Sequence, residues 1–341
     1  MCHNSGMFFK RLLVRAIYAT IYILFAFVAT GAVVLLQSKT HVFSVANNPE
    51  PNIDTNTPFP VSVNAYTQVI KEDPVVNQYF YDALAQAPTS KDRWWNKVAA
   101  VFSAHDWYQN MASPVSRILV IWPGERKEEI TKHIGDILGW DETARTEFQQ
   151  LTDTTAPVMV DGKYFPSQYV AQSDATPADV HELISSTFKT SILDRYTPAV
   201  AAQVPLEQTL IIASLLEREA SDFDNMREIS GVIWNRLFIN MPLQLDATLQ
   251  YVKGGNVNEK KWWPIVKPDD KYLKSAYNTY KNNGLPPAPI SNPSTEAILA
   301  ALNPIFTDCL FYFHTNEGTY YCSATYEEHV TKLKSVYGRG K

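Results

Sequence analysis

The residues best suited to chemistry are two glutamates, Glu217 and Glu219, in the stretch "IIASLLEREAS" at positions 211–221. The apolar residues around them predict a helix with few polar neighbours. A carboxyl group partly desolvated beside apolar helix faces has a raised pKa, which suits a general acid near neutral pH. The structural alternative places both glutamates on a helix surface, but apolar residues occupy the whole circumference of this helix.

The helical neighbours of the two glutamates differ in size. The positions three and four residues before and after Glu217 hold only Ala and Ser, which predicts a shallow trough that a ligand could fill. The same positions around Glu219 include the bulky Leu215, Leu216 and Phe223. We therefore favour Glu217 as the catalytic residue and expect Glu219 to be structural or half-exposed.

No other arrangement of reactive residues in the sequence competes with these glutamates. The chain has no G-x-S-x-G nucleophile elbow, and its seven histidines lack the spacing of a metal site. We expect His133, His181, His314 and His329 to be structural. The sequence therefore predicts an enzyme without a metal site and without a cofactor.

A distinct N-terminal segment precedes the part of the chain that must position the glutamates. Residues 16–36 are 21 positions without a charge, long enough to cross a bilayer, and three basic residues but no acidic residue precede them. We expect a cytoplasmic tail at 1–15, a single transmembrane helix at 16–36, and the remainder outside. A cleaved signal peptide is the alternative, because small residues occur at 29–32.

The composition beyond this segment is that of an acidic globular protein. Without the three N-terminal basic residues, 27 Lys and Arg remain against 35 Asp and Glu. Binding to phosphates needs a basic face, so the sequence argues against a nucleic-acid partner.

Two of the three cysteines, Cys309 and Cys322, flank the predicted turn "TNEG". A tight hairpin places Cys322 opposite Phe311 rather than opposite Cys309. This diagonal arrangement leaves a disulfide between the two cysteines open.

The remaining segments predict an α+β protein. Residues 37–60 are rich in Pro and Asn and predict a linker, and 61–117 are mixed, with short helices. "RILVIWPGE" predicts a strand and "RKEEITKHIGDILGW" a helix, which together form a small α/β unit at 118–156. We expect a second α+β domain at 157–341, which ends in a hairpin and a helix.

Several helices of this second domain have clear start signals. "TPADVHELISSTFKTSIL" has Thr176 as N-cap and Pro177 at N1, and "PLEQTLIIASLLEREAS" opens with Pro205 at the first helical position. Further helices are predicted for "NMREISGVIWNRLF" and "STEAILAAL", and a closing helix from Tyr326. Between the last two helices, "CLFYFHTNEGTYYCS" predicts the hairpin.

Five motifs in a fixed order resemble the endolytic murein transglycosylase family, also called YceG-like: "IIASLLEREA", "GVIWNRL", "MPLQLDATLQYV", "AYNTYKNNGLPPAPISNP" and "TYEEH". "RILVIWPGERKEEI" resembles the LysM-like segment of that family. The resemblance covers 118–335, is most specific at 205–293, and does not extend over 41–117. The sequence departs from the usual family residues at Ser167, Ala247, Ala288, Tyr320 and Cys322.

The resemblance implies a membrane-anchored lytic transglycosylase that cuts nascent peptidoglycan at the MurNAc–GlcNAc bond without a cofactor. The family places its catalytic glutamate first in the E-R-E triplet, which is Glu217 here. The resemblance also implies a location in the bacterial inner (plasma) membrane and cell-wall synthases, the penicillin-binding proteins, as partners. The domain at 157–341 would be the catalytic one and 118–156 the LysM-like unit.

Polar residues of the matched motifs are candidates for holding the glycan, and a structural role is an equal alternative for each. Asp246 could instead serve a peptidoglycan hydrolase as the second carboxylate that activates water. A third hypothesis is a non-catalytic glycan-binding scaffold, but the retention of Glu217 argues against it. The candidate glycan-binding residues are Asn235, Gln244, Asp246, Thr248, Tyr277, Asn278 and Thr279.

Overall fold

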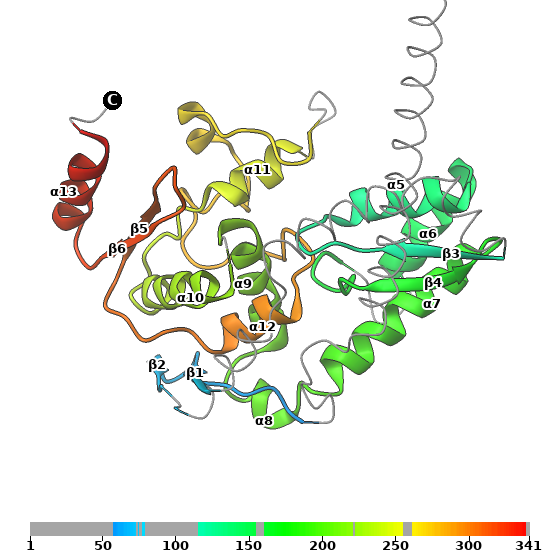
Figure 1. The fold of residues 1–341 in the computed structure, drawn as a ribbon, viewed down its shortest axis with the longest axis horizontal. Helices are drawn as coiled ribbons and strands as arrows, with labels where there is room; N and C mark the ends of the chain where they lie inside the picture. Colours follow the sequence, from blue (N-terminus) through cyan, green and yellow to red (C-terminus); the bar gives the residue numbers. More distant parts are fainter. Residues whose placement is uncertain are drawn as a thin grey trace, which may run out of the picture. The chain divides into compact units, whose positions relative to one another are not determined.

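The computed structural model describes residues 57–72, 74, 77–78, 115–154, 160–220, 222–254 and 261–338. The predicted tail and transmembrane helix, and most of the linker and of 61–117, lie outside these ranges. None of the helices within them is both long and apolar enough to span a bilayer. The described part combines many helices with three two-stranded sheets, which confirms the predicted α+β class (Figure 1).

A strand-and-helix unit forms one part of the fold. Strand β3 (Ser116–Val120) pairs antiparallel with β4 (Gln168–Gln172), and α5 (Lys127–Leu138) and α6 (Glu142–Thr154) lie between them in sequence. Helix α7 (Pro177–Phe188) follows β4 and packs on α6. The strand and helix predicted from "RILVIWPGERKEEI" are both present.

This unit has its own hydrophobic cluster, which includes Leu119, Ile130, Phe148, Tyr164 and Val180, all buried. The cluster therefore contains residues from both sides of the boundary expected after residue 156.

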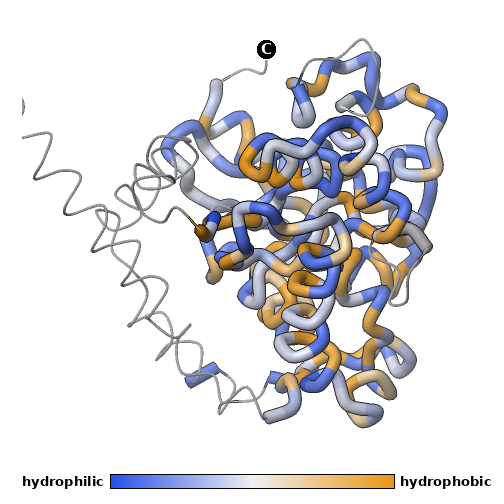
Figure 2. Tube along the Cα trace, turned by 90° about the vertical axis from the view of Figure 1, so that its right-hand side faces the viewer, coloured by the Kyte–Doolittle hydropathy of each residue, from blue (hydrophilic) through white to orange (hydrophobic). Residues whose placement is uncertain are grey.

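Three helices form the core that carries the two glutamates: α9 (Leu206–Glu219), α10 (Phe223–Phe238) and α12 (Thr295–Leu302). Trp234 of α10 is buried, and its Nε1 donates to the carbonyl of Ala301 at 2.9 Å. Along most helices hydrophobic and hydrophilic stretches alternate (Figure 2), as expected for helices that each bury one face.

The predicted starts of the other helices are correct to within one residue, but α10 begins at Phe223, two residues before the predicted start at Asn225. Thr176 caps α7 as expected, with Pro177 at N1, and its side chain accepts from the Asp179 amide. Helix α9 begins at Leu206, so Pro205 is its N-cap rather than its first helical residue. Asp222 caps α10 by accepting from the Asn225 amide.

The C-terminal hairpin consists of β5 (Phe311–His314) and β6 (Tyr320–Ser323), and α13 (Tyr326–Tyr337) follows it. Cys322 pairs with Tyr312, one residue away from the predicted Phe311. The prediction was wrong because Thr319 belongs to the loop: its carbonyl accepts from the Thr315 amide at 2.9 Å, which makes the loop one residue longer.

The open question about the cysteines is answered by a disulfide between Cys309 and Cys322, whose Cα atoms are 5.7 Å apart. Cys309 lies two residues before β5, so the bond joins the chain entering the hairpin to the second strand.

Shorter elements complete the described part. They are β1 (Val63–Asn64) paired with β2 (Val69–Ile70), the π-helical turn η1 (Lys189–Leu193), α8 (Pro198–Ala201), α11 (Asp246–Gly254) and the 3-10 turn η2 (Pro268–Tyr272).

Candidate active site

Glu217 lies in the last turn of α9, and its carboxyl group meets the first turn of α12. Its Oε2 accepts two hydrogen bonds from Ser294, one from the backbone amide at 3.0 Å and one from Oγ at 2.8 Å. Ser294 is also the N-cap of α12, because its Oγ accepts from the Ala297 amide at 3.1 Å. In the part of the chain that the structure describes, no donor reaches Oε1. Among the described residues, the carboxyl therefore has one engaged and one unengaged oxygen.

The surroundings of Glu217 favour its protonated form. Burial raises the pKa of this carboxyl above its ordinary value, the two hydrogen bonds from Ser294 oppose that rise, Glu296 adds to it, and Arg218 opposes it. A carboxyl whose pKa is raised donates its proton to a leaving group at a higher pH than an ordinary glutamate can.

The trough predicted beside Glu217 is not open to a ligand, so that expectation is wrong. Ser214 is fully buried, and its Oγ accepts from the Ile290 amide at 3.0 Å while its carbonyl accepts from Ser291 Oγ at 3.1 Å. The small side chains on α9 let this loop approach the helix and fill the trough. On the C-terminal side the helix ends at Glu219, so Ala220 is extended and is not a helical neighbour.

Asn292, in the same loop, joins it to the strand-and-helix unit. Its side chain is fully buried, and its Oδ1 accepts from the amides of Gly162 at 2.8 Å and Tyr164 at 2.9 Å. Its Nδ2 donates to the carbonyl of Glu125 at 3.0 Å, and its own carbonyl accepts from the Gly124 amide at 2.8 Å. One side chain thus connects three segments next to Glu217.

Gly124 brings the loop between β3 and α5 against the two residues at the end of α9. It has a left-handed φ of 83°. A Cβ at this position would lie 3.1 Å from Arg218 Nη1 and 3.5 Å from Glu217 Cγ. The strand-and-helix unit therefore supplies one wall of the site.

Arg218 places a positive charge between the two glutamates. Its guanidinium lies 3.9 Å from the ring centroid of Trp263, and Trp263 Nε1 donates to Glu129 Oε2 at 3.2 Å. Burial lowers the pKa of Arg218, while Glu129, Glu217 and Glu219 raise it. Among the described residues no acceptor reaches its buried Nε.

Glu219 has both carboxyl oxygens engaged, which agrees with a structural role. Oε1 accepts from the Ala247 amide at 3.3 Å, at the start of α11, and Oε2 accepts from the Tyr312 hydroxyl at 3.1 Å, on β5. Burial, with a further contribution from Asp246, raises the pKa of Glu219 to about 7. The residue thus ties α9 to α11 and to the hairpin.

Three of the predicted glycan-binding residues reach the surface near α11. Asp246 is exposed at the first position of α11 and accepts from the Tyr280 hydroxyl at 2.6 Å. Gln244 is exposed and has a left-handed φ of 52°. Tyr277 is partly exposed, with its ring centroid 4.9 Å from that of Tyr251.

The other four lie where they bind protein atoms. Thr248 and Thr279 are buried with their hydroxyl oxygens 3.0 Å apart. Asn278 is buried and donates to the backbone carbonyls of residues 271 and 273. Asn235 donates to the carbonyls of Thr307 and Cys309, just before the hairpin.

Sequence reasoning assigned no role to Ser294, Asn292 or Gly124, although all three lie within or beside the quoted motifs. The available signal was the N-cap pattern of Ser294 before the apolar "TEAILAAL". Nothing local indicated that this cap would face Glu217, 77 positions earlier.

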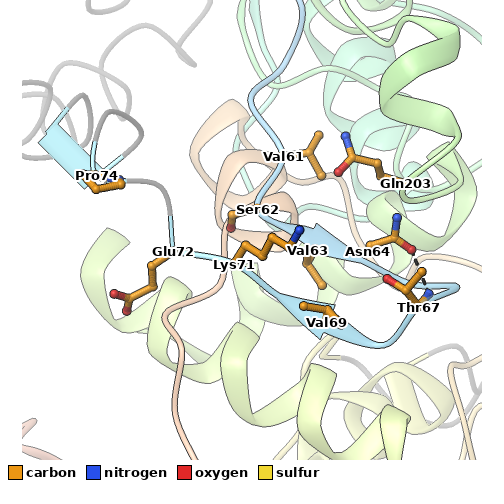
Figure 3. Close-up of a pocket in the computed structure, with 10 residues that line it drawn as sticks. All are labelled: Val61, Ser62, Val63, Asn64, Thr67, Val69, Lys71, Glu72, Pro74 and Gln203. Carbon is orange, nitrogen blue, oxygen red and sulfur yellow. Dashed lines mark hydrogen bonds between the residues drawn. The ribbon is translucent and has the colours of Figure 1, made fainter.

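A hollow of about 680 Å³ lies elsewhere, around β1 and β2 (Figure 3). Its lining includes Asn64, Lys71 and Gln203 and none of the residues that contact Glu217. The candidate site is therefore not this hollow. Within the described ranges, no three His, Cys, Asp or Glu residues are grouped as metal ligands.

Comparison with known proteins gives consistent matches. The YceG-like family matches residues 71–335, so the match begins before residue 118, where the resemblance was expected to start. Endolytic murein transglycosylases from Bacillus subtilis and Streptococcus pneumoniae serotype 2 are 33% and 29% identical over 181 residues, which is 52% of this chain. The match covers 48% and 32% of those relatives, so the chain spans less than half the length of the curated relatives it matches.

A solved structure also matches. The crystal structure of a yceG-like protein from Listeria monocytogenes superimposes with a TM-score of 0.55 at 27% sequence identity. The superposition covers 63% of this chain and 75% of that one.

Proposed function

This chain belongs to the YceG-like family, and we propose that it is a lytic transglycosylase that cleaves peptidoglycan glycan strands internally. The Glu217 carboxyl carries the proposal: Ser294 holds one of its oxygens, and burial favours its protonated form. The activity named for the relatives from Bacillus subtilis and Streptococcus pneumoniae supports the same reaction.

In the proposed mechanism Glu217 acts first as general acid and then as general base. It donates its proton to the glycosidic oxygen between MurNAc and GlcNAc, and the bond from that oxygen to the anomeric carbon breaks. The 6-hydroxyl of the same MurNAc attacks the anomeric carbon and returns its proton to Glu217, which closes a 1,6-anhydro ring. No water is consumed, so the second carboxylate of an ordinary glycosidase is not required.

We assign Gln244, Asp246 and Tyr277 to glycan binding, because their side chains reach the surface. The other four candidates would act indirectly, by holding the loops on which the glycan lies; they are Asn235, Thr248, Asn278 and Thr279. Exposed polar side chains and a tyrosine ring are suited to the hydroxyl groups and the apolar face of a sugar.

The mass of the products tests the reaction. The full chain, purified in mild detergent, is incubated with purified glycan strands, and the fragments are weighed. We expect ends that lack the elements of one water, and Asp246→Asn should still produce them. Ordinary reducing ends that disappear in Asp246→Asn would identify a hydrolase, and unchanged strands would identify a binding protein.

We also propose that residues 16–36 anchor the protein in the bacterial inner membrane, with the part beyond Gln37 outside. The 21-residue uncharged run and the basic residues before it support this orientation. Protease added to intact spheroplasts should then digest the bulk of the protein. Survival until lysis would reverse the orientation. Cell-wall synthases remain predicted partners.

A further inference from the structure

Ser294 directs both of its hydrogen-bond donors at the same oxygen of Glu217. The backbone amide lies 3.0 Å and Oγ 2.8 Å from Oε2. A serine hydroxyl has one hydrogen and two lone pairs, and here the hydrogen goes to Glu217 while a lone pair accepts from the Ala297 amide at 3.1 Å. The geometry of the cap thus orients the hydroxyl hydrogen toward the carboxyl group.

We propose that Ser294 is the positioning residue of the reaction: by engaging Oε2 with two donors, it makes Oε1 the oxygen that carries the catalytic proton. The catalytic part of this inference rests on the proposed function. The arrangement of the two donors at Oε2 rests on the hydrogen bonds alone.

The donors around the carboxyl group determine which of its oxygens carries the proton. The hydrogens of the Ser294 amide and hydroxyl already point at Oε2. A proton bound to Oε2 would point toward these two donor hydrogens and would find no acceptor there. Among the described residues, the hydrogen bonds to the Glu217 carboxyl come only from Ser294 and end at Oε2, so no donor reaches Oε1. The proton therefore resides on Oε1, which can present it to a glycosidic oxygen and accept a proton from the 6-hydroxyl afterwards.

The same two hydrogen bonds act on the acidity of Glu217. They stabilise its ionised form and oppose burial, which favours the neutral form. The charged groups that face the carboxyl are Arg218, which favours ionisation, and Glu296 of α12, which disfavours it. Glu129 and Glu219 interact with Arg218 in turn. Removal of the Ser294 hydroxyl should therefore raise the pKa of Glu217.

The chain allows this role to be separated from helix capping. Glycine is nearly as good an N-cap as serine but has no hydroxyl, so Ser294→Gly removes one donor to Glu217 at little cost to α12. Ser294→Thr keeps the donor. Thr176→Gly, at the N-cap of α7, changes a cap that does not contact Glu217 and serves as the matched control. Ser294→Ala provides a second variant without the hydroxyl if the glycine variant fails to fold.

Two measurements on the full chain in detergent test the inference. The first is the pH profile of kcat/KM on glycan strands, whose alkaline limb reports deprotonation of the acid in the free enzyme. The second is a carbon NMR titration of the glutamate carboxyl groups, with the Glu217 signal identified by its absence in Glu217→Gln. The NMR titration needs no activity.

We expect both midpoints to rise by about one pH unit in Ser294→Gly and Ser294→Ala, since one of two donors to the ionised form is lost. They should stay in place in Ser294→Thr and Thr176→Gly. Midpoints that are unmoved or lowered in the variants without the hydroxyl would overturn the inference, even if anhydro products form. A raised NMR midpoint in a protein that forms no anhydro product would instead sustain the positioning role and reject the proposed function.

Discussion

The two sides of the last turn of α9 form an instructive contrast. On one side, Glu217 receives both of its hydrogen bonds from a single residue and at a single oxygen. On the other side, Glu219 receives one hydrogen bond at each oxygen, from α11 and from β5. Burial raises the pKa of both groups, so desolvation alone does not distinguish them. Among the described residues, the donors leave one oxygen of Glu217 unengaged, whereas both oxygens of Glu219 connect α9 to other elements.

The largest expected effect of this contrast is on activity. Glu217→Gln keeps the shape of the side chain and an oxygen for the Ser294 donors, but it cannot transfer the proton. Because one group serves as acid and base in the proposed mechanism, the rate should fall by at least about 10²–10⁴-fold, with little change in the melting temperature. The rate of formation of anhydro-ended products measures the loss.

Glu219→Gln is the matched control for that experiment, since it makes the same chemical change two residues away on the same helix. It should retain measurable turnover and alter mainly stability. If Glu219→Gln were folded but inactive while Glu217→Gln kept near-normal activity, Glu219 would be the catalytic residue and Glu217 the structural one.

The second effect concerns the loop that holds the Glu217 side together. Asn292→Ala leaves the buried amides of Gly162 and Tyr164 without their acceptor, and each unsatisfied group costs about 1–3 kcal/mol. We expect the free energy of unfolding to fall by roughly 3 kcal/mol, measured by urea denaturation.

Asn282→Ala provides the comparison for this loss, because Asn282 also makes several side-chain hydrogen bonds but is exposed. Water can replace its partners, so its loss should cost less than about 1 kcal/mol. An equal loss of unfolding free energy in the two variants would show that the hydrogen bonds of Asn292 contribute no more than those of an exposed side chain.

The two glutamates also show which features of the site could be predicted from the local sequence. Local signals predicted α7, α9 and α10, because start signals such as Thr176 and Pro205 and the apolar period are properties of adjacent residues. The choice of Glu217 over Glu219 was made from neighbours on the same helix. Part of that reason was wrong, because the trough is filled by the loop that contains Ile290 and Ser291.

What could not be predicted is long-range. The pairing of β3 with β4 spans about fifty residues, and the contact between Ser294 and Glu217 spans 77 positions. Helical and strand periodicities carry no information on which distant segment fills a groove. The hairpin register failed for a local reason, since Thr319 closes the loop through Thr315.

The third prediction concerns the pH dependence of the stability that Glu219 contributes. The pKa of Glu219 is about 7 in the folded protein, above its ordinary value of 4.5, so the folded state binds this proton more tightly than the unfolded state. The resulting stability is complete below about pH 4.5 and is lost as the pH rises to 7.

Glu219→Gln removes this titration. Relative to wild type, its free energy of unfolding should therefore rise by roughly 2–3 kcal/mol between pH 4.5 and pH 8. Urea denaturation of both proteins at several pH values measures the difference. Parallel curves for the two proteins would mean that the pKa of Glu219 is the same in the folded and the unfolded state, so that its enclosure does not favour the protonated form.

The smallest effect comes from the wall of the Glu217 side, at Gly124. Its left-handed φ of 83° is unfavourable for alanine by about 1 kcal/mol, and the new methyl group would meet Arg218 Nη1 at 3.1 Å and Glu217 Cγ at 3.5 Å. Gly318, in the β5–β6 turn, has a φ of 85° and open space at the same position. Gly124→Ala and Gly318→Ala should therefore share the loss of about 1 kcal/mol that the left-handed φ causes, measured by thermal unfolding. Only Gly124→Ala should also slow the formation of anhydro products, by roughly three- to tenfold, because a displaced Arg218 shifts the charge and packing beside Glu217. Equal activities in the two variants would remove the loop between β3 and α5 from the site.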